Sequence, residues 1–232
     1  MPRSSPCCAA VLIGLYVYGA SLPAAAQQPP PQVPPSSTEV PRLDKVEAFG
    51  YRWGVIAAPE WSFADGVLRL IKDRQPIPGR PRKPQNYALA ETAPYKKVTV
   101  ELDMQPGGKS LVIVYAWQDE SHFNYAHISS DAARAVNVHN GIFHVFGGER
   151  VRISPLEGPG SFPVRAPGNR EAAWIPVKLV WDGATGRVAV EVNGRRNPSL
   201  EAVDLSLTEG RVGLGSFNET GGFRSLKILR VP

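Results

Sequence analysis

The sequence predicts an all-β protein in which antiparallel sheets pack as a sandwich. Short stretches of alternating apolar and polar residues recur along the chain between turn residues, which is typical of strands. Glycine and proline are plentiful, at 22 and 23 of 232 residues. Helical periodicity is nearly absent, so the pattern fits an all-β domain.

The first 26 residues predict a secretory signal peptide. Arg3 supplies a positive charge, residues 7–22 are apolar, and small residues precede position 27, an order typical of export signals. The apolar run is shorter than the roughly 20 residues that span a bilayer, and a membrane anchor is the alternative. We expect a secreted or periplasmic protein with no membrane span after signal removal.

The rest of the chain divides into a linker and one domain. Residues 27–42 are rich in proline without apolar periodicity, which predicts a disordered linker. Residues 43–232 have the length of a single β-sandwich domain. Cys7 and Cys8 both lie in the predicted signal peptide, so we expect no disulfide in the mature chain.

Strands are expected where alternation and turn signals coincide. Asp65-Gly66 precedes the first clear strand, and Asn193-Gly194 is a strong hairpin signal. A Pro-rich loop at 73–86 separates the first two strands. The expected strands lie at 67–72, 87–91, 96–105, 111–117, 123–129, 141–147, 177–182, 187–194, 210–217 and 223–231.

Three consecutive strands in the middle of the chain predict a binding face. If they pair in order, alternation places five side chains on one face, namely Tyr115, Trp117, Tyr125, His127 and His144. Flat rings beside hydrogen-bonding groups can stack on sugar rings. Two interpretations remain, an exposed ligand-binding surface or an aromatic core. The polar members favour exposure, because buried polar groups need partners.

The charge pattern argues against a nucleic-acid partner. The net charge is +5, and the basic residues are scattered apart from the 73–86 loop, with Arg74, Arg80, Arg82 and Lys83, and the Lys96-Lys97 pair. A nucleic-acid reader would need a basic stripe with interleaved aromatics. We expect a carbohydrate or cell-surface glycan as partner, with a merely solvated loop as the alternative.

The C-terminal half resembles a known family. W-I-P-V-K-L-V-W-D-G-A-T-G-R-V-A-V-E-V-N-G, G-R-V-G-L-G-S-F and G-G-F-R-S-L-K-I follow one another closely. This order resembles the last strands of concanavalin A-like jelly-roll domains of the laminin G and glucanase type, and it is similar to bacterial 3-keto-disaccharide hydrolase-like domains. The resemblance implies a two-sheet antiparallel jelly-roll β-sandwich that holds ligands on its concave face.

The same resemblance draws attention to E-L-D-M-Q at 101–105. Retaining β-glucanases of this fold carry Glu-x-Asp-x-Glu, which implies a nucleophile role for Glu101 beside Asp103. Glycoside hydrolysis needs two carboxylates across the scissile bond, and Gln105 stands where the acid/base would be. The alternative is the polar face of an amphipathic strand, with Leu102 and Met104 directed inward.

Metal ligands are not predicted, although calcium is possible. The histidines, His122, His127, His139 and His144, lack a familiar short zinc spacing and a cysteine partner. Jelly rolls of this type often bind calcium through loop carboxylates. The candidates are Asp119, Glu120, Asp131 and Asp182.

The sequence therefore favours a secreted, lectin-like domain that binds carbohydrate. A glycoside hydrolase-like enzyme that uses Glu101 and Asp103 is the first alternative. A laminin G-like adhesion module with a protein partner is the second.

Overall fold

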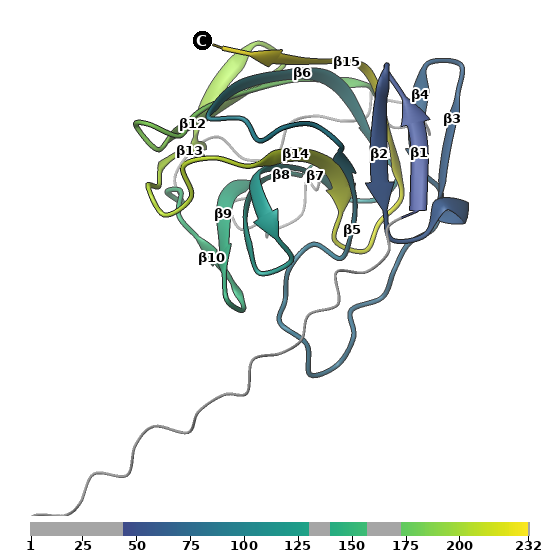
Figure 1. Ribbon diagram of the computed structural model, residues 1–232, viewed down its shortest axis with the longest axis horizontal. Coiled ribbons are helices and arrows are strands. Elements are labelled where there is room, and N and C mark those ends of the chain that lie inside the picture. Colours follow the sequence, from purple (N-terminus) through teal and green to yellow (C-terminus); the bar gives the residue numbers. More distant parts are fainter. Residues whose placement is uncertain (1–43, 130–139, 157–172, 232) are drawn as a thin grey trace, which may run out of the picture. The chain divides into compact units, whose positions relative to one another are not determined.

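The computed structural model describes residues 44–129, 140–156 and 173–231, and these form an antiparallel β-sandwich (Figure 1). The predicted signal peptide and linker, 1–26 and 27–42, lie outside the described residues. A short 3-10 helix, η1 (Ala58–Glu60), precedes β3. No helix in the described ranges is long and apolar enough to cross a membrane.

The described residues build two sheets that alternate along the chain. The eight-stranded sheet has the order β1-β2-β5-β14-β7-β8-β9-β10, and the seven-stranded sheet has the order β13-β12-β11-β6-β15-β4-β3. The strands are β1 (Asp44–Ala48), β2 (Tyr51–Val55), β3 (Trp61–Ala64), β4 (Val67–Leu70), β5 (Asn86–Ala90), β6 (Lys97–Pro106), β7 (Ser110–Asp119), β8 (His122–Ser129), β9 (Gly141–Phe146), β10 (Arg150–Arg152), β11 (Ile175–Asp182), β12 (Arg187–Val192), β13 (Arg195–Val203), β14 (Arg211–Ser216) and β15 (Gly221–Arg230). The predicted two-sheet jelly roll is confirmed.

The space between the sheets holds the main hydrophobic core. Strand β6 illustrates why, because its ten residues alternate between half-buried and buried. Leu102 and Met104 point inward as predicted, against the inward side chains of the eight-stranded sheet. Trp53, Trp61 and Trp181 are buried in the same core. Alternation therefore gives each sheet one apolar face that packs against the other sheet.

The eight-stranded sheet also has an apolar outer face. In Figure 1 the seven-stranded sheet arches over it, so the face turned away is the concave face of the sandwich. The side chains on this concave face are Tyr87, Leu89, Val112, Val114, Phe123, Tyr125, Phe143 and Val145, with Trp117 and Phe217 packed against them. The 71–85 loop between β4 and β5 borders the same face, with Lys83 Nζ 6.0 Å from the centroid of the Phe123 ring.

A bulge in β7 decides which aromatic side chains reach the concave face. Ala116 has a φ of 51°, and the pairing of β7 with β8 shifts register after Tyr115. Tyr115 faces the inter-sheet core in alternation with Leu111 and Ile113, and the extra residue at Ala116 turns Trp117 to the concave face. Gly210 makes room for the bulge, since a Cβ there would lie 2.2 Å from the carbonyl carbon of Ala116.

Candidate functional site

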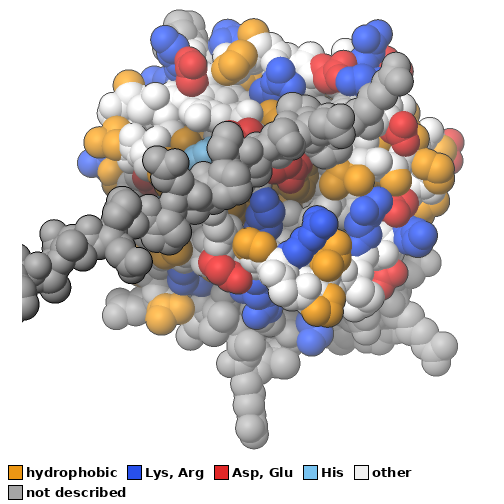
Figure 2. All heavy atoms as spheres, turned by 60° about the horizontal axis from the view of Figure 1, so that its bottom comes forward, with side chains coloured by type: hydrophobic (Ala, Val, Ile, Leu, Met, Phe, Trp, Pro, Cys, Tyr) orange, Lys and Arg blue, Asp and Glu red, His pale blue; other side chains and the backbone are white. Residues whose placement is uncertain are grey.

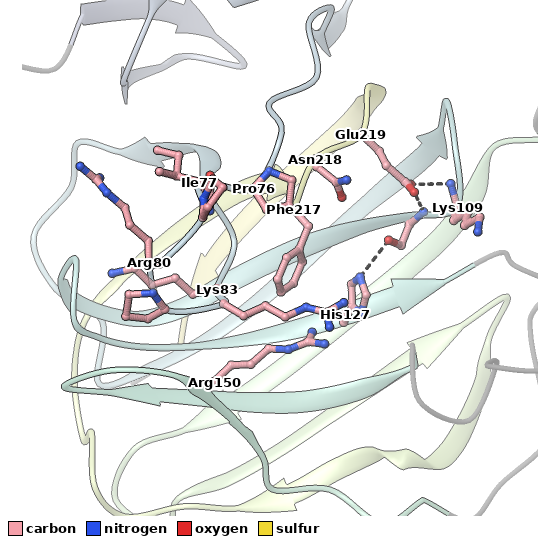
Figure 3. A pocket seen from close by; sticks show the side chains of 16 residues that line it. Pro76, Ile77, Arg80, Lys83, Lys109, His127, Arg150, Phe217, Asn218 and Glu219 are labelled. Carbon is pink, nitrogen blue, oxygen red and sulfur yellow. Dashed lines mark hydrogen bonds between the residues drawn. The ribbon is translucent and has the colours of Figure 1, made fainter.

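A cavity of about 550 Å³ opens on the concave face (Figure 3). One wall is the 76–85 stretch of the Pro-rich loop. The opposite wall comes from the sheet, with Ser110 at the start of β7, His127 on β8 and Arg150 on β10, and from the turn after β14, with Phe217, Asn218 and Glu219. The space has the size of small-molecule sites.

Aromatic rings form the floor next to this cavity. The Tyr125 and Phe143 rings stack at a centroid separation of 5.2 Å and an angle of 8°. Phe217 meets Tyr125 edge-on at 5.8 Å and lies 5.3 Å from the His127 ring. Phe217 is half-buried, whereas Tyr125 and Phe143 are buried. Of these three rings, Phe217 is therefore the one that is exposed enough for a ligand to contact.

His127 connects the aromatic floor to hydrogen-bonding groups. Its Nε2 lies 2.8 Å from Ser110 Oγ, and both residues are buried. The backbone N–H of Ser110 donates to Glu219 Oε2 at 2.6 Å, and that of Lys109 donates to the same oxygen. The Glu219 carboxylate thus fixes the rim of the cavity, and Figure 3 shows the chain of contacts from Glu219 through Ser110 to His127.

Arg150 lies over the aromatic floor. Its guanidinium carbon is 4.7 Å from the Phe143 centroid and 4.6 Å from the Phe217 centroid, and Nη1 donates to Tyr125 Oη at 3.3 Å. Burial raises the pKa of Tyr125 well above its usual range, against the opposing charges of Arg150 and Arg82. The phenol therefore stays neutral and accepts from Arg150 at all ordinary pH values.

A second arginine adds positive charge beside the first. Burial lowers the pKa of Arg152, and the charge of Arg150 lowers it further. Arg152 Nη2 donates to the carbonyl oxygens of Asn140, at 2.6 Å, and Pro155, at 2.8 Å. Its guanidinium carbon lies 5.6 Å from the Phe143 ring. Two guanidinium groups, of Arg150 and Arg152, therefore lie beside the Phe143 ring.

The Pro-rich loop is anchored to the domain by Glu60. Arg74 donates to both carboxylate oxygens of Glu60, at 2.7 and 3.0 Å, and Asn86 Nδ2 donates to Oε2 at 2.9 Å. Further along, Lys83 donates to the Glu120 carbonyl oxygen. The loop that the sequence left as possibly solvated is thus held against the sheet at both ends, with Arg80, Arg82 and Lys83 lining the cavity.

The structure separates the five residues that alternation placed together. Tyr125 and His127 lie on the concave face, and His127 lines the cavity. Trp117 is on that face too, but it does not line the cavity. Its Nε1 donates to Tyr87 Oη at 3.3 Å. Tyr115 faces the inter-sheet core, 5.6 Å from Trp181. His144 pairs with Asn124 and also leaves the concave face.

Register explains why the predicted face was wrong for Tyr115 and His144. Tyr115 pairs with Asn124 and not with Tyr125, and Asn124 in turn pairs with His144. Directly paired residues point to the same side of a sheet, so one step of register moves a side chain to the opposite face. The shared-face interpretation assumed a register that the strands do not adopt.

His144 belongs to a separate polar cluster with Asp204, Asn124 and Ser206. His144 Nδ1 lies 3.0 Å from Asp204 Oδ2 and 3.3 Å from Ser206 Oγ. Partial burial would raise the pKa of Asp204, but hydrogen bonds from Ser206 and Asn124 and the nearby His144 hold it below its usual value. Because the serine and the aspartate meet the same imidazole nitrogen, the cluster lacks the two-sided geometry of a hydrolytic triad.

Glu101 and Asp103 lie on the outer face of the seven-stranded sheet. Glu101 pairs with Lys178 at 3.1 Å, and Asp103 pairs with Arg224 at 3.0 Å. They line a shallow pocket of about 340 Å³. Both carboxylates thus serve as partners of cations on neighbouring strands, on the opposite side of the sandwich from the concave-face cavity.

The described residues contain no group of three or more His, Cys, Asp or Glu side chains arranged for a metal ion. Asp119 contacts His122 at 2.9 Å, and Asp182 lies 3.6 Å from Lys97. Of the other two calcium candidates, Glu120 accepts from Lys83 through its backbone carbonyl oxygen, and Asp131 lies outside the described residues, as does His139. Calcium binding stays an untested expectation.

The sequence alone missed Phe217, Arg150 and Ser110 as neighbours of His127. Phe217 stands at the end of an expected strand, and Arg150 and Ser110 carry no motif. Strand β10 lies beside the aromatic floor because of strand pairing: Tyr125 pairs with Phe143, and Phe143 pairs with Arg152. The register of β8, β9 and β10 would have been needed to predict that Arg150 lies beside this floor.

Comparison with known proteins identifies the fold. No family model and no curated protein sequence matches the chain. Among solved structures it resembles the carbohydrate-binding module CBM66 from Bacillus subtilis, with 15% identity over 76% of this chain and 94% of that chain and a TM-score of 0.55.

Two further structures show the same architecture. A proposed glycosyl hydrolase from Parabacteroides distasonis is 17% identical over 75% of this chain and 92% of its own, with a TM-score of 0.51. The GH43 protein BlXynB from Bacillus licheniformis is 11% identical over 77% of this chain and 37% of its own, also at 0.51. The chain has the concanavalin A-like jelly-roll fold.

Proposed function

We propose that the chain is an exported carbohydrate-binding module that holds a saccharide in the concave-face cavity. The observation that carries this proposal is the convergence, on one cavity of about 550 Å³, of the half-buried Phe217 ring with the buried pair His127 and Ser110. A ring face for the apolar side of a sugar and polar groups for its hydroxyls are the two surfaces that such a ligand needs.

Binding is favoured over hydrolysis by the positions of the acidic residues. Glu101 and Asp103 are engaged in ion pairs with Lys178 and Arg224 on the opposite face. Among the described residues that line the cavity, Glu219 is the one acidic side chain. It accepts hydrogen bonds from the backbone N–H groups of Ser110 and Lys109. A retaining or inverting mechanism needs two carboxylates that face each other.

The experiment that tests the proposal is a calorimetric screen of the purified chain against neutral and acidic oligosaccharides, with calcium and with a chelator. We expect at least one saccharide to bind and to be recovered intact by chromatography. Cleaved product would establish the hydrolase alternative. A blank screen would overturn saccharide binding and leave the adhesion alternative, in which the partner is a protein.

A variant pair assigns the binding to the cavity. Phe217→Ala should weaken the affinity about tenfold, since an aromatic contact is worth on the order of 1 kcal/mol beyond its area. Phe146→Ala is the matched control, because Phe146 is 56% exposed at the end of β9 and does not line the cavity. Equal effects of the two variants would contradict the assignment.

A further inference from the structure

The cavity is lined by more positively charged side chains than a neutral saccharide would need for binding. Five basic side chains line it, Arg80, Arg82, Lys83, Lys109 and Arg150, against one carboxylate, Glu219. That carboxylate accepts from the Lys109 and Ser110 backbone N–H groups. Figure 2, which turns the lower side of Figure 1 forward, shows lysine and arginine side chains interleaved with hydrophobic and acidic ones.

Four of these cations have no carboxylate partner within the described residues. Elsewhere in that part of the chain, Arg74, Arg224, Arg196 and Lys178 each lie 2.7–3.1 Å from a carboxylate oxygen. Lys83 instead contacts the Glu120 carbonyl oxygen and the Phe123 ring, and Arg150 contacts rings and a phenol, while Arg80 and Arg82 line the cavity. Their positive charge is concentrated around one cavity, in which Glu219 supplies the one carboxylate among the described lining residues.

Two of the four are brought together by the backbone. The Arg150 N–H donates to the Arg82 carbonyl oxygen at 3.3 Å, so the loop and β10 meet at these two residues. Arg150 is half-buried and is held against Phe143 and Phe217. A guanidinium fixed in this way presents a planar fork that matches a carboxylate or sulfate bidentately.

We propose that the cavity selects an acidic saccharide, whose anionic group is held by Arg150, Arg82 and Lys83 while its ring lies against Phe217. The proposal rests on the proposed carbohydrate-binding function and deepens it. A free anion would use the cations but leave the aromatic ring unused. The anionic group is a uronic acid carboxylate or a sulfate ester, which share this chemistry.

Matched ligands test the proposal without a change in sugar shape. Oligogalacturonate, oligoglucuronate and oligomannuronate are each compared with their own methyl esters, and sulfated oligosaccharides with their desulfated forms. The chain should bind at least one acidic form about tenfold or more tightly than its neutral counterpart at 0.15 M salt, where exposed charges are screened. The arm that binds identifies carboxylate or sulfate as the source.

Charge-matched variants separate the cavity from the overall charge. Arg150→Gln, and independently Arg82→Gln on the exposed loop, should each reduce the acidic preference at least about threefold. Arg195→Gln removes the same charge from an exposed position on β13 of the other sheet and should leave it unchanged. Circular dichroism checks that each variant is folded, and the Arg82 variant tests the proposal even if the Arg150 variant is unstable.

Each other outcome counts against the inference. Binding of acidic and neutral forms with equal affinity would overturn it while the carbohydrate-binding function stands. Failure of every saccharide would overturn both. An equal loss on Arg195→Gln, or equal binding of a single-stranded oligonucleotide, would show a general attraction of anions to the chain and would also overturn it.

Discussion

At the residue scale, the outcome for each aromatic side chain depends on which face of one sheet it reaches. Tyr125 and His127 lie on the concave face with Phe217, whereas Tyr115 is 1% exposed in the inter-sheet core. The two tyrosines therefore have different roles although both lie on neighbouring strands. Tyr115 stabilises the sandwich, and Tyr125 positions Arg150.

Truncation of Tyr115 should therefore destabilise the protein. Tyr115→Ala leaves a cavity beside Trp181 and should lower the free energy of unfolding by about 3–5 kcal/mol. Urea denaturation followed by circular dichroism measures the change. A variant as stable as the parent chain would mean that the Tyr115 ring is not in the core.

The pKa of Asp204 gives a prediction about acid stability. A carboxyl pKa that is lower in the folded chain than its ordinary value of 3.8 stabilises the folded state above that value. This contribution is lost as the pH falls from about 4 through the lower, folded-state pKa. Parent and Asp204→Asn urea midpoints should therefore differ at pH 7 and converge towards pH 3.

Asp73→Asn, at an exposed position in the Pro-rich loop, is the control for this pH series. It should leave the pH dependence of the parent chain in place. A difference between the parent chain and Asp204→Asn that does not shrink on acidification would contradict the stabilising role of the ionised Asp204.

At the element scale, two devices shape the binding face, the β7 bulge and the anchored loop. The bulge at Ala116 rotates Trp117 onto the concave face and packs on Gly210. The loop is tied to the sandwich by Arg74, Glu60 and Asn86. Both devices depend on partners that are not neighbours in sequence. Ala116 and Gly210 are 94 residues apart, and Glu60 and Arg74 are 14 residues apart.

The bulge should be sensitive to any side chain at position 210. Gly210→Ala places a Cβ 2.2 Å from the backbone of Ala116, so a strand must move, and the free energy of unfolding should fall by about 1–3 kcal/mol. Gly148→Ala is the control, because a Cβ there meets nothing within 4 Å. Similar urea midpoints for both variants would contradict the close packing of the bulge.

The loop should come loose when its anchor is removed. Glu60→Gln leaves Arg74 without its ionic partner and should lower the free energy of unfolding by about 1–3 kcal/mol. Trypsin should then cut faster after Arg82, because Arg80 and Lys83 are followed by proline, with the cleavage site read by mass spectrometry. Glu47→Gln breaks an exposed pair with Arg52 and should change the cleavage rate little.

At the scale of the whole molecule, the architecture was predictable from local patterns. Alternation over 96–105 matches the burial of β6 residue by residue, and Asn193-Gly194 forms the turn between β12 and β13. These features depend on neighbours in sequence. The two-sheet sandwich follows because each strand has one apolar face that must be covered.

The site was only partly predictable, because it depends on register and on a bulge. Tyr125 and His127 share a face by alternation alone, and the structure places both on the concave face. The position of Trp117 requires the positive φ of Ala116, and the separation of Tyr115 from Tyr125 requires the β7–β8 register. Arg150 and Phe217 join the site through strand pairings that no local pattern encodes.

Hydrogen exchange, with and without the tightest-binding saccharide of the screen, tests the central claim most directly. The account predicts slower amide exchange at the start of β7, in β8 and at residues 217–219, with no change on the outer face around Glu101 and Asp103. Protection of that outer face, with the concave-face cavity unchanged, would contradict the account.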